Sequence, residues 1–91
     1  MALDPQQTEA HYALGAVLEE AGQPRQALDS LEQALAQAPH HARAWNVKGL
    51  ALQTLRQYAD ADRAYRQAIT LTPEAAEAHA NLATLLEARG L

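Results

Sequence analysis

The sequence overlays on itself when it is shifted by 34 residues. The residues that coincide are Pro5, Pro39 and Pro73; Gly15, Gly49 and Ala83; Ala10, Ala44 and Ala78; Ala27 and Ala61; Ala34 and Ala68; and His11, Trp45 and His79. Coincidences at one fixed offset indicate stacked copies of a small structural unit, because each copy covers the hydrophobic face of its neighbour. Such a chain is expected to form an extended array rather than one irregular core.

The composition favours helices within each copy. Much of the 48% apolar content is alanine, with leucine next, and the sequence has no phenylalanine. Alanine and leucine are strong helix formers, and the small alanine side chain lets two helices approach closely. The predicted fold class is therefore all-α, without strands.

Five helices are predicted from the apolar spacing and from the residues that end each run. Their expected ranges are residues 8–21, 24–37, 42–55 and 58–71, with a fifth that starts at Thr72-Pro73-Glu74 and ends near residue 88. Thr8 is the expected N-cap of the first helix. Helices joined by turns this short must be antiparallel neighbours, with Gly15 and Ala27 nearest each other in the first pair.

Two short turns join the paired helices. Gly22 suits the first, because glycine adopts the left-handed backbone conformation without steric cost. Arg56 stands at the equivalent place in the second turn. A non-glycine residue there costs about 1–2 kcal/mol, so the second turn is expected to be weaker or differently shaped.

The repeat divides the chain into four segments. Residues 1–7 read as the remnant of a preceding unit, 8–41 and 42–75 as two complete units, and 76–91 as the lone first helix of a third. The positions expected to hold these units together are Leu14, Gly15, Leu18, Ala27, Leu31, Ala34, Pro39, Trp45, Gly49, Leu52, Ala61, Tyr65, Ala68, Pro73, Leu82, Ala83 and Leu86.

Charge and hydropathy exclude several classes of partner. The formal net charge of −4 argues against a nucleic-acid binder, which needs a basic face. No apolar run is long enough to span a bilayer, so no membrane insertion is expected. The absence of cysteine excludes disulfides and thiol chemistry. We expect a soluble chain; its compartment stays open, with the cytoplasm favoured.

Nothing in the sequence indicates catalysis. His40 and His41 fall in a link, His11 and His79 fall in the column of Trp45, and none has metal-ligand spacing. The single serine, Ser30, has no histidine-acid constellation near it in sequence. The predictions are therefore no catalytic residue, no metal and no cofactor.

The set Trp45, Gly49, Ala61, Tyr65, Ala68 and Pro73 resembles the tetratricopeptide repeat, as does its counterpart in the first unit. The resemblance covers residues 8–91 and implies a right-handed α-solenoid of five helices. Pentatricopeptide repeats have a nearby period, but they bind RNA and are usually basic. Lys48 and Asp62 depart from the pattern, because leucine occupies the equivalent positions Leu14, Leu82 and Leu28. We hypothesise that these two residues pair; the alternative is that each reaches solvent at the edge of the unit, with the methylene stem of the lysine lying along the surface.

The resemblance also implies a binding groove lined by the first helix of each unit. The implied groove positions are Glu9, Tyr12, Ala13, Ala16, Glu19, Glu20, Arg43, Asn46, Val47, Leu50, Gln53, Thr54, Glu77, Ala80, Asn81, Thr84 and Glu87. An apolar strip rimmed by acids and amides suits an extended or helical peptide of neutral or basic character.

Two binding modes known in the family are not supported by these residues. Members that grip acidic C-terminal peptides use lysine, arginine and asparagine; the matching places here are Tyr12, Ala16, Val47, Glu77 and Asn81. The asparagine ladder of the glycosyltransferase-linked members is also missing, since Ala13 and Val47 share the column of Asn81.

The leading functional prediction is a non-catalytic module that binds a peptide or partner protein in this groove. One alternative is self-assembly into homo-oligomers through apolar faces at the terminal helices, with Leu82, Leu86 and Leu91 on the last one. Another is a regulatory segment of a larger enzyme. The sequence does not identify the partner.

Overall fold

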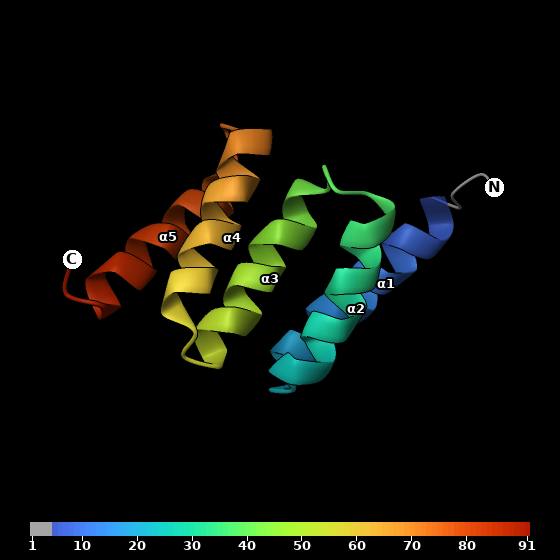
Figure 1. Cartoon of the computed structure of the whole chain (residues 1–91), viewed down its shortest axis with the longest axis horizontal. Coiled ribbons are helices and arrows are strands. Elements are labelled where there is room, and N and C mark those ends of the chain that lie inside the picture. Colours follow the sequence, from blue (N-terminus) through green and yellow to red (C-terminus); the bar gives the residue numbers. More distant parts are fainter. Residues whose placement is uncertain (1–4) are drawn as a thin grey trace.

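The computed structural model describes residues 5–91 and contains only helices, turns and short links in that range (Figure 1). The helices are α1 (Pro5–Glu20), α2 (Pro24–Gln37), α3 (Ala42–Thr54), α4 (Tyr58–Leu71) and α5 (Ala76–Ala88). The array is elongated, with extents of 45, 28 and 17 Å. The prediction of an all-α solenoid with five helices is confirmed for the described residues.

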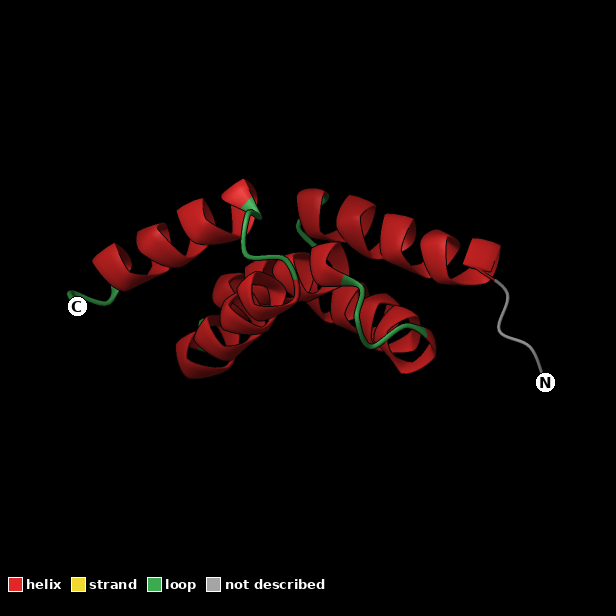
Figure 2. Ribbon diagram, turned by 90° about the horizontal axis from the view of Figure 1, so that it is seen from above, coloured by secondary structure: helices red, strands yellow, loops and turns green. Residues whose placement is uncertain are grey.

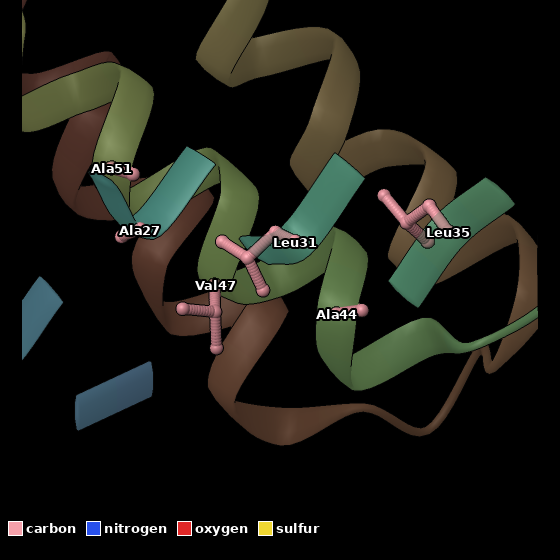
Figure 3. Close-up of a cluster of buried hydrophobic side chains, with 6 residues drawn as sticks. All are labelled: Ala27, Leu31, Leu35, Ala44, Val47 and Ala51. Carbon is pink, nitrogen blue, oxygen red and sulfur yellow. The ribbon is translucent and has the colours of Figure 1, made fainter. Parts of the chain in front are cut away.

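The hydrophobic core is continuous from one unit to the next. A first cluster joins α2 to α3 and is made of Ala27, Leu31, Leu35, Ala44, Val47 and Ala51 (Figure 3). A second joins α3, α4 and α5 and is made of Leu52, Ala61, Ala64, Tyr65 and Leu85. Five of these eleven residues are alanine, whose small side chain lets the helices pack closely.

The predicted close contacts occur at the two helical glycines. A Cβ atom built on Gly15 would lie 2.7 Å from the Leu31 side chain and 3.3 Å from the carbonyl oxygen of Ala27. A Cβ atom on Gly49 would lie 2.4 Å from the Tyr65 ring. Glycine at these positions therefore lets the paired helices approach to a distance that alanine would prevent.

Each link between units is fixed by a side chain from the following helix. The indole Nε1 of Trp45 donates to the carbonyl oxygen of Pro39 at 2.8 Å. Nε2 of His79 donates to the carbonyl oxygen of Pro73 at 2.7 Å. In both bonds the donor lies six residues after the acceptor in the sequence. His79 therefore makes in the next unit the hydrogen bond that the Trp45 indole makes in this one.

Two helices start at other residues than predicted. Helix α1 begins at Pro5, because proline is tolerated in a first helical turn. The Thr8 hydroxyl does not cap this helix: it donates to Oε1 of Gln37 at 2.8 Å and ties α1 to α2. Residues 1–4 of the expected leading segment lie outside the described residues.

The predicted start of α5 is also wrong. Thr72 is the C-cap of α4, where its N–H bonds to the carbonyl oxygen of Ala68, and α5 begins at Ala76. Pro73 thus lies in the link, as Pro39 does in the previous unit.

The predicted pairing of Lys48 with Asp62 is wrong. Nζ of Lys48 lies 2.7 Å from Oε1 of Glu32 on α2 and 4.9 Å from the centre of the Trp45 ring. Asp62 instead contacts Arg66 on its own helix and Arg89 at the end of α5. The lysine therefore turns toward the preceding unit, whereas the aspartate faces the following one.

Leu14 does not belong to the packed interior: it is 50% exposed. Its equivalent Lys48 faces α2 of the preceding unit, and among the described helices none packs on that side of α1. None of the described helices has the length and apolar character that crossing a membrane requires.

Candidate functional site on the concave face

The first helices of the units, α1, α3 and α5, share one face of the array. Helix α3 contacts both α1 and α5. Figure 2 shows α1 and α5 on the same side at opposite ends, with the remaining helices below the gap between them. We call the surface formed by α1, α3 and α5 the concave face.

A pocket of about 610 Å³ opens where the first turns of α3 and α5 meet. Its walls are Glu9, His40, His41, Ala42, Arg43, Asn46, Thr72, Ala75, Ala76, Glu77 and Ala78. This volume is within the range of sites that bind small ligands or single side chains. The alanines leave the pocket wide, while its polar character comes from the charged residues and one amide.

His41 fixes one side of this pocket. Its Nδ1 accepts the N–H of Ala44 at 3.1 Å and so caps α3. The proton must then be on Nε2, which donates to Oε1 of Glu9 at 2.8 Å. The ring also contacts Tyr12, with 4.7 Å between ring centres. One histidine thus joins α1 to the start of α3 and holds Glu9 at the pocket.

An amide pair crosses the middle of the concave face. Nδ2 of Asn81 on α5 donates to Oδ1 of Asn46 on α3 at 3.0 Å. Asn46 is only 7% exposed, so this bond satisfies a buried polar group. The two asparagines occupy different columns of the repeat, and the pair therefore gave no repeated signal in the sequence.

A carboxylate lies between α1 and α3 at the opposite end. Oε2 of Glu19 accepts from the Thr54 hydroxyl at 3.1 Å, whereas its buried Oε1 has no hydrogen-bond partner. Burial raises the pKa of Glu19, and the hydrogen bond from Thr54 lowers it by less. The Tyr65 hydroxyl donates to Oε1 of Gln53 at 2.7 Å, and burial and the nearby Glu19 charge raise the pKa of Tyr65.

The implied groove positions are only partly open to solvent. Ala80 and Thr84 are exposed, whereas Tyr12, Ala16 and Leu50 are half-buried and pack against the two core clusters, and Glu19, Gln53 and Asn81 are also half-buried. Val47, implied as a groove residue, is 8% exposed and belongs to the first cluster, because its side chain faces α2 (Figure 3). The apolar side chains expected to line the groove thus mostly pack against the core. The pocket lies instead at the start of α3 and α5.

Sequence reasoning missed the part played by His41, which was expected only to be a link residue. The links themselves supply pocket walls at Thr72 and Ala75. One feature of the sequence could have predicted this role: each link comes directly before a helix of the concave face, so its residues lie beside that face. Among residues 5–91, no three histidine, aspartate or glutamate side chains are grouped as metal ligands would be.

A second pocket, of about 490 Å³, lies between α3 and α4. Trp45, Lys48 and Leu52 line it from α3, and its α4 side includes Asp60 and Arg63. The ionic groups there already have partners within the chain, since Lys48 contacts Glu32 and Arg63 contacts Asp60.

Sequence and structure comparisons with known proteins both find helical repeats like those of this chain. Two family models, both described as tetratricopeptide repeat, match residues 12–53 and 42–75. A search of curated protein sequences gave no match. The crystal structure of MamA superposes with a TM-score of 0.87 at 28% identity, covering 98% of this chain and 52% of that one. The chain thus spans about half the length of MamA.

A second similar structure is the second TPR of Spaghetti (RPAP3) bound to the HSP90 peptide SRMEEVD. Its TM-score is 0.86 at 21% identity, and the match covers 93% of this chain and 79% of that one. At this identity the likeness concerns the fold alone.

Proposed function

Because the chain belongs to the tetratricopeptide repeat family, we propose that its concave face binds a peptide segment of a partner protein. The segment is neutral or basic and is extended or helical. The proposal assigns binding without catalysis, which agrees with the family's general use as an interaction module.

The pocket at the first turns of α3 and α5 carries this proposal. It is wide enough for a side chain, and the buried Asn46 amide at its wall can orient a peptide backbone. Glu9 and Glu77 line it as exposed acids, next to Arg43. A lysine or arginine of the segment would meet the two carboxylates, and an apolar residue would fit over the alanine floor.

Charge distinguishes this proposal from the binding seen in the RPAP3 domain, whose bound peptide SRMEEVD is acidic. The places that match the family's peptide clamp hold Tyr12, Ala16, Val47, Glu77 and Asn81. None of these is basic, and Glu77 would repel an acidic peptide. Partners of this chain are therefore expected to differ in charge from that peptide.

A displayed library of random peptides, panned against the purified chain, tests the proposal. Enriched peptides are synthesised, and their affinities are measured by fluorescence anisotropy for the parent chain and for two variants. Arg43→Trp fills the pocket, and Glu77→Lys reverses one of its charges. Each should weaken binding about tenfold or more, which corresponds to about 1.4 kcal/mol.

Two matched controls use exposed residues of α2. Arg25→Trp and Asp29→Lys make the same chemical changes away from the pocket, and both should leave the affinities unchanged. Equal loss in all four variants would contradict the proposal, as would enrichment of acidic peptides. Circular dichroism establishes that each variant is folded.

One observation favours a second candidate, self-association through α1. Leu14 and Val17 are 50% and 61% exposed on the side of α1 that corresponds to a covered side of α3. There the equivalent of Val17 is Ala51, which is fully buried in the cluster shared with α2. Sedimentation of the chain over a range of concentrations tests this candidate. Association that Leu14→Lys abolishes would support it, and a monomer at all concentrations would exclude it.

A further inference from the structure

We propose that His41 makes binding at the pocket at the first turns of α3 and α5 dependent on pH. With a neutral His41 ring the pocket accepts a basic peptide segment, and with a protonated ring it releases that segment. This inference rests on the proposed function and adds its regulation. It concerns one side chain, which joins α1 to the start of α3.

The two ring nitrogens of His41 have opposite hydrogen-bonding roles. Nδ1 accepts the N–H of Ala44 at 3.1 Å, and Nε2 donates to Oε1 of Glu9 at 2.8 Å. Only a neutral imidazole can accept with one nitrogen and donate with the other. The side chain is 15% exposed, and its ring centre lies 4.7 Å from that of Tyr12, so the ring has little room to turn in place. The observed arrangement therefore belongs to the neutral ring.

Protonation of His41 removes the cap of α3. An imidazolium ring has a donor on both nitrogens and no acceptor, so its Nδ1–H would point at the N–H of Ala44. The added positive charge would also lie at the N-terminus of α3, where the helix dipole disfavours it. Ala44 is fully buried, so water cannot replace the lost acceptor while the first turn stays closed. The turn must therefore loosen, and it carries the pocket residues Ala42 and Arg43.

The charges around the ring set the direction of the effect. Titratable or charged side chains face His41 or the pocket beside it from each neighbouring element: Glu9 and Tyr12 from α1, His40 from the link, Arg43 from α3 and Glu77 from α5. While His41 is neutral, the carboxylates outnumber the guanidinium group by one, and a basic segment is attracted. A proton on His41 cancels this excess. Glu9 holds the protonated ring only weakly, because its side chain is mostly exposed to water.

Two other histidines do not share this property. Nε2 of His79 donates to the carbonyl oxygen of Pro73, and a protonated ring can make the same bond. His40 is exposed at the pocket wall, and the N-cap of α3 is its neighbour His41. Imidazole groups take up a proton between about pH 8 and pH 5. For His41, a proton gained in this range breaks a contact on which the pocket depends.

NMR of the whole chain without peptide tests the loss of the cap. Between pH 7.5 and 5.5 the hydrogen-exchange protection factor of the Ala44 N–H should fall about tenfold, as expected for a lost helix cap. The Tyr65 N–H on α4 should keep its protection. His41→Asn should abolish the decrease at Ala44, because asparagine caps helices well and does not titrate. The matched control His40→Asn should retain it.

Fluorescence anisotropy tests the effect on binding. The probe is a peptide enriched from the displayed library that contains lysine or arginine. Its affinity for the parent chain should fall about tenfold between pH 7.5 and 5.5, since the pocket loses both its shape and its negative charge. His41→Asn should bind the peptide with little change over this range. His40→Asn should retain most of the decrease.

Three outcomes would overturn the inference and leave the proposed function standing. The Ala44 N–H keeps its protection at pH 5.5, the peptide binds the parent chain equally well at both pH values, or the pH dependence disappears in His40→Asn and persists in His41→Asn. Absence of binding at both pH values would instead contradict the proposed function, and this inference with it.

Discussion

Arg56 has the same backbone geometry as Gly22. Both have positive φ angles, 63° and 78°. The N–H of the next residue bonds in each case to a carbonyl oxygen five residues back, from Gln23 to Leu18 and from Gln57 to Leu52, both at 2.8 Å. The turn at Arg56 therefore has the same shape as the turn at Gly22. The sequence had left open a different shape for it. The packing of the paired helices imposes the left-handed conformation on Arg56, although this conformation favours glycine.

Arg56→Gly should stabilise the chain. Removal of the Cβ atom relieves about 1–2 kcal/mol of strain from the left-handed conformation. Glycine also raises the conformational entropy of the unfolded chain, which offsets part of this stabilisation. The expected net increase in the free energy of unfolding is about 0.5–1 kcal/mol, measured by urea denaturation. The reverse change Gly22→Arg should destabilise by a similar amount. Equal stability of all three chains would show that Arg56 is unstrained.

The periodicity predicted the helices, their pairing and buried positions such as Ala27 and Ala61, because a column of the repeat reports the same environment in every unit. It failed where that environment changes. Leu14 and Lys48 share a column, yet one is half exposed and the other contacts Glu32, since α2 packs on that side of α3 and no described helix packs there on α1. The starts of α1 and α5 were missed because the prolines of one column also differ in environment. Pro5 is the first residue of a helix, whereas Pro73 lies in a link.

Gly49→Ala should destabilise the chain more than Gly15→Ala. Alanine improves helix propensity by about 1 kcal/mol at either position. At Gly49 the new methyl group meets the rigid Tyr65 ring, and overpacking of this kind costs about 1–3 kcal/mol. At Gly15 it meets Cγ and Cδ2 of Leu31 at 2.7 and 2.8 Å and the carbonyl oxygen of Ala27 at 3.3 Å; the leucine is buried but has more freedom to shift than a ring. Thermal unfolding should show a lower Tm for both variants, with the larger decrease for Gly49→Ala.

A second substitution checks the cause. Tyr65→Leu removes the ring, so Gly49→Ala should cost less in that background than in the parent chain. Additive effects of the two changes would mean that the ring is not the obstacle.

Lys48 should be coupled to Glu32 and not to Asp62. The lysine and Glu32 form a partly exposed pair, for which a double-mutant cycle should give about 0.2–1 kcal/mol that falls with added salt. A cycle between Lys48 and Asp62 should give no coupling, because the aspartate contacts Arg66 and Arg89. Alanine variants and urea denaturation measure both cycles. Coupling to Asp62 as large as that to Glu32 would contradict the observed contacts.

The candidate site was less predictable than the fold. A column shared by Tyr12, Asn46 and Ala80 implied groove positions, but it carries no information about which neighbour each side chain meets. Asn46 pairs with Asn81 across two columns, and Val47 turns into the core. The pocket also depends on link residues, whose positions follow from tertiary packing rather than from helical periodicity.

Glu19 should make the chain less stable at neutral pH than an uncharged residue would. Burial disfavours the carboxylate and raises its pKa above the ordinary value of 4.5, while the Thr54 hydroxyl offsets only part of this effect. The folded chain therefore binds a proton more readily than the unfolded chain does. As pH rises from below 4.5 through the raised pKa, the folded state loses stability relative to the unfolded state.

Glu19→Gln removes this penalty, because the amide stays neutral and its oxygen can still accept from Thr54. The variant should be more stable than the parent chain at pH 7, and the two should converge below pH 4.5, where both side chains are uncharged. Urea denaturation of both chains between pH 3.5 and 7 measures this difference. Glu20→Gln, on the exposed neighbour, is the matched control and should show no such pH-dependent gain. A constant difference between the parent chain and Glu19→Gln at all pH values would instead assign the effect to packing.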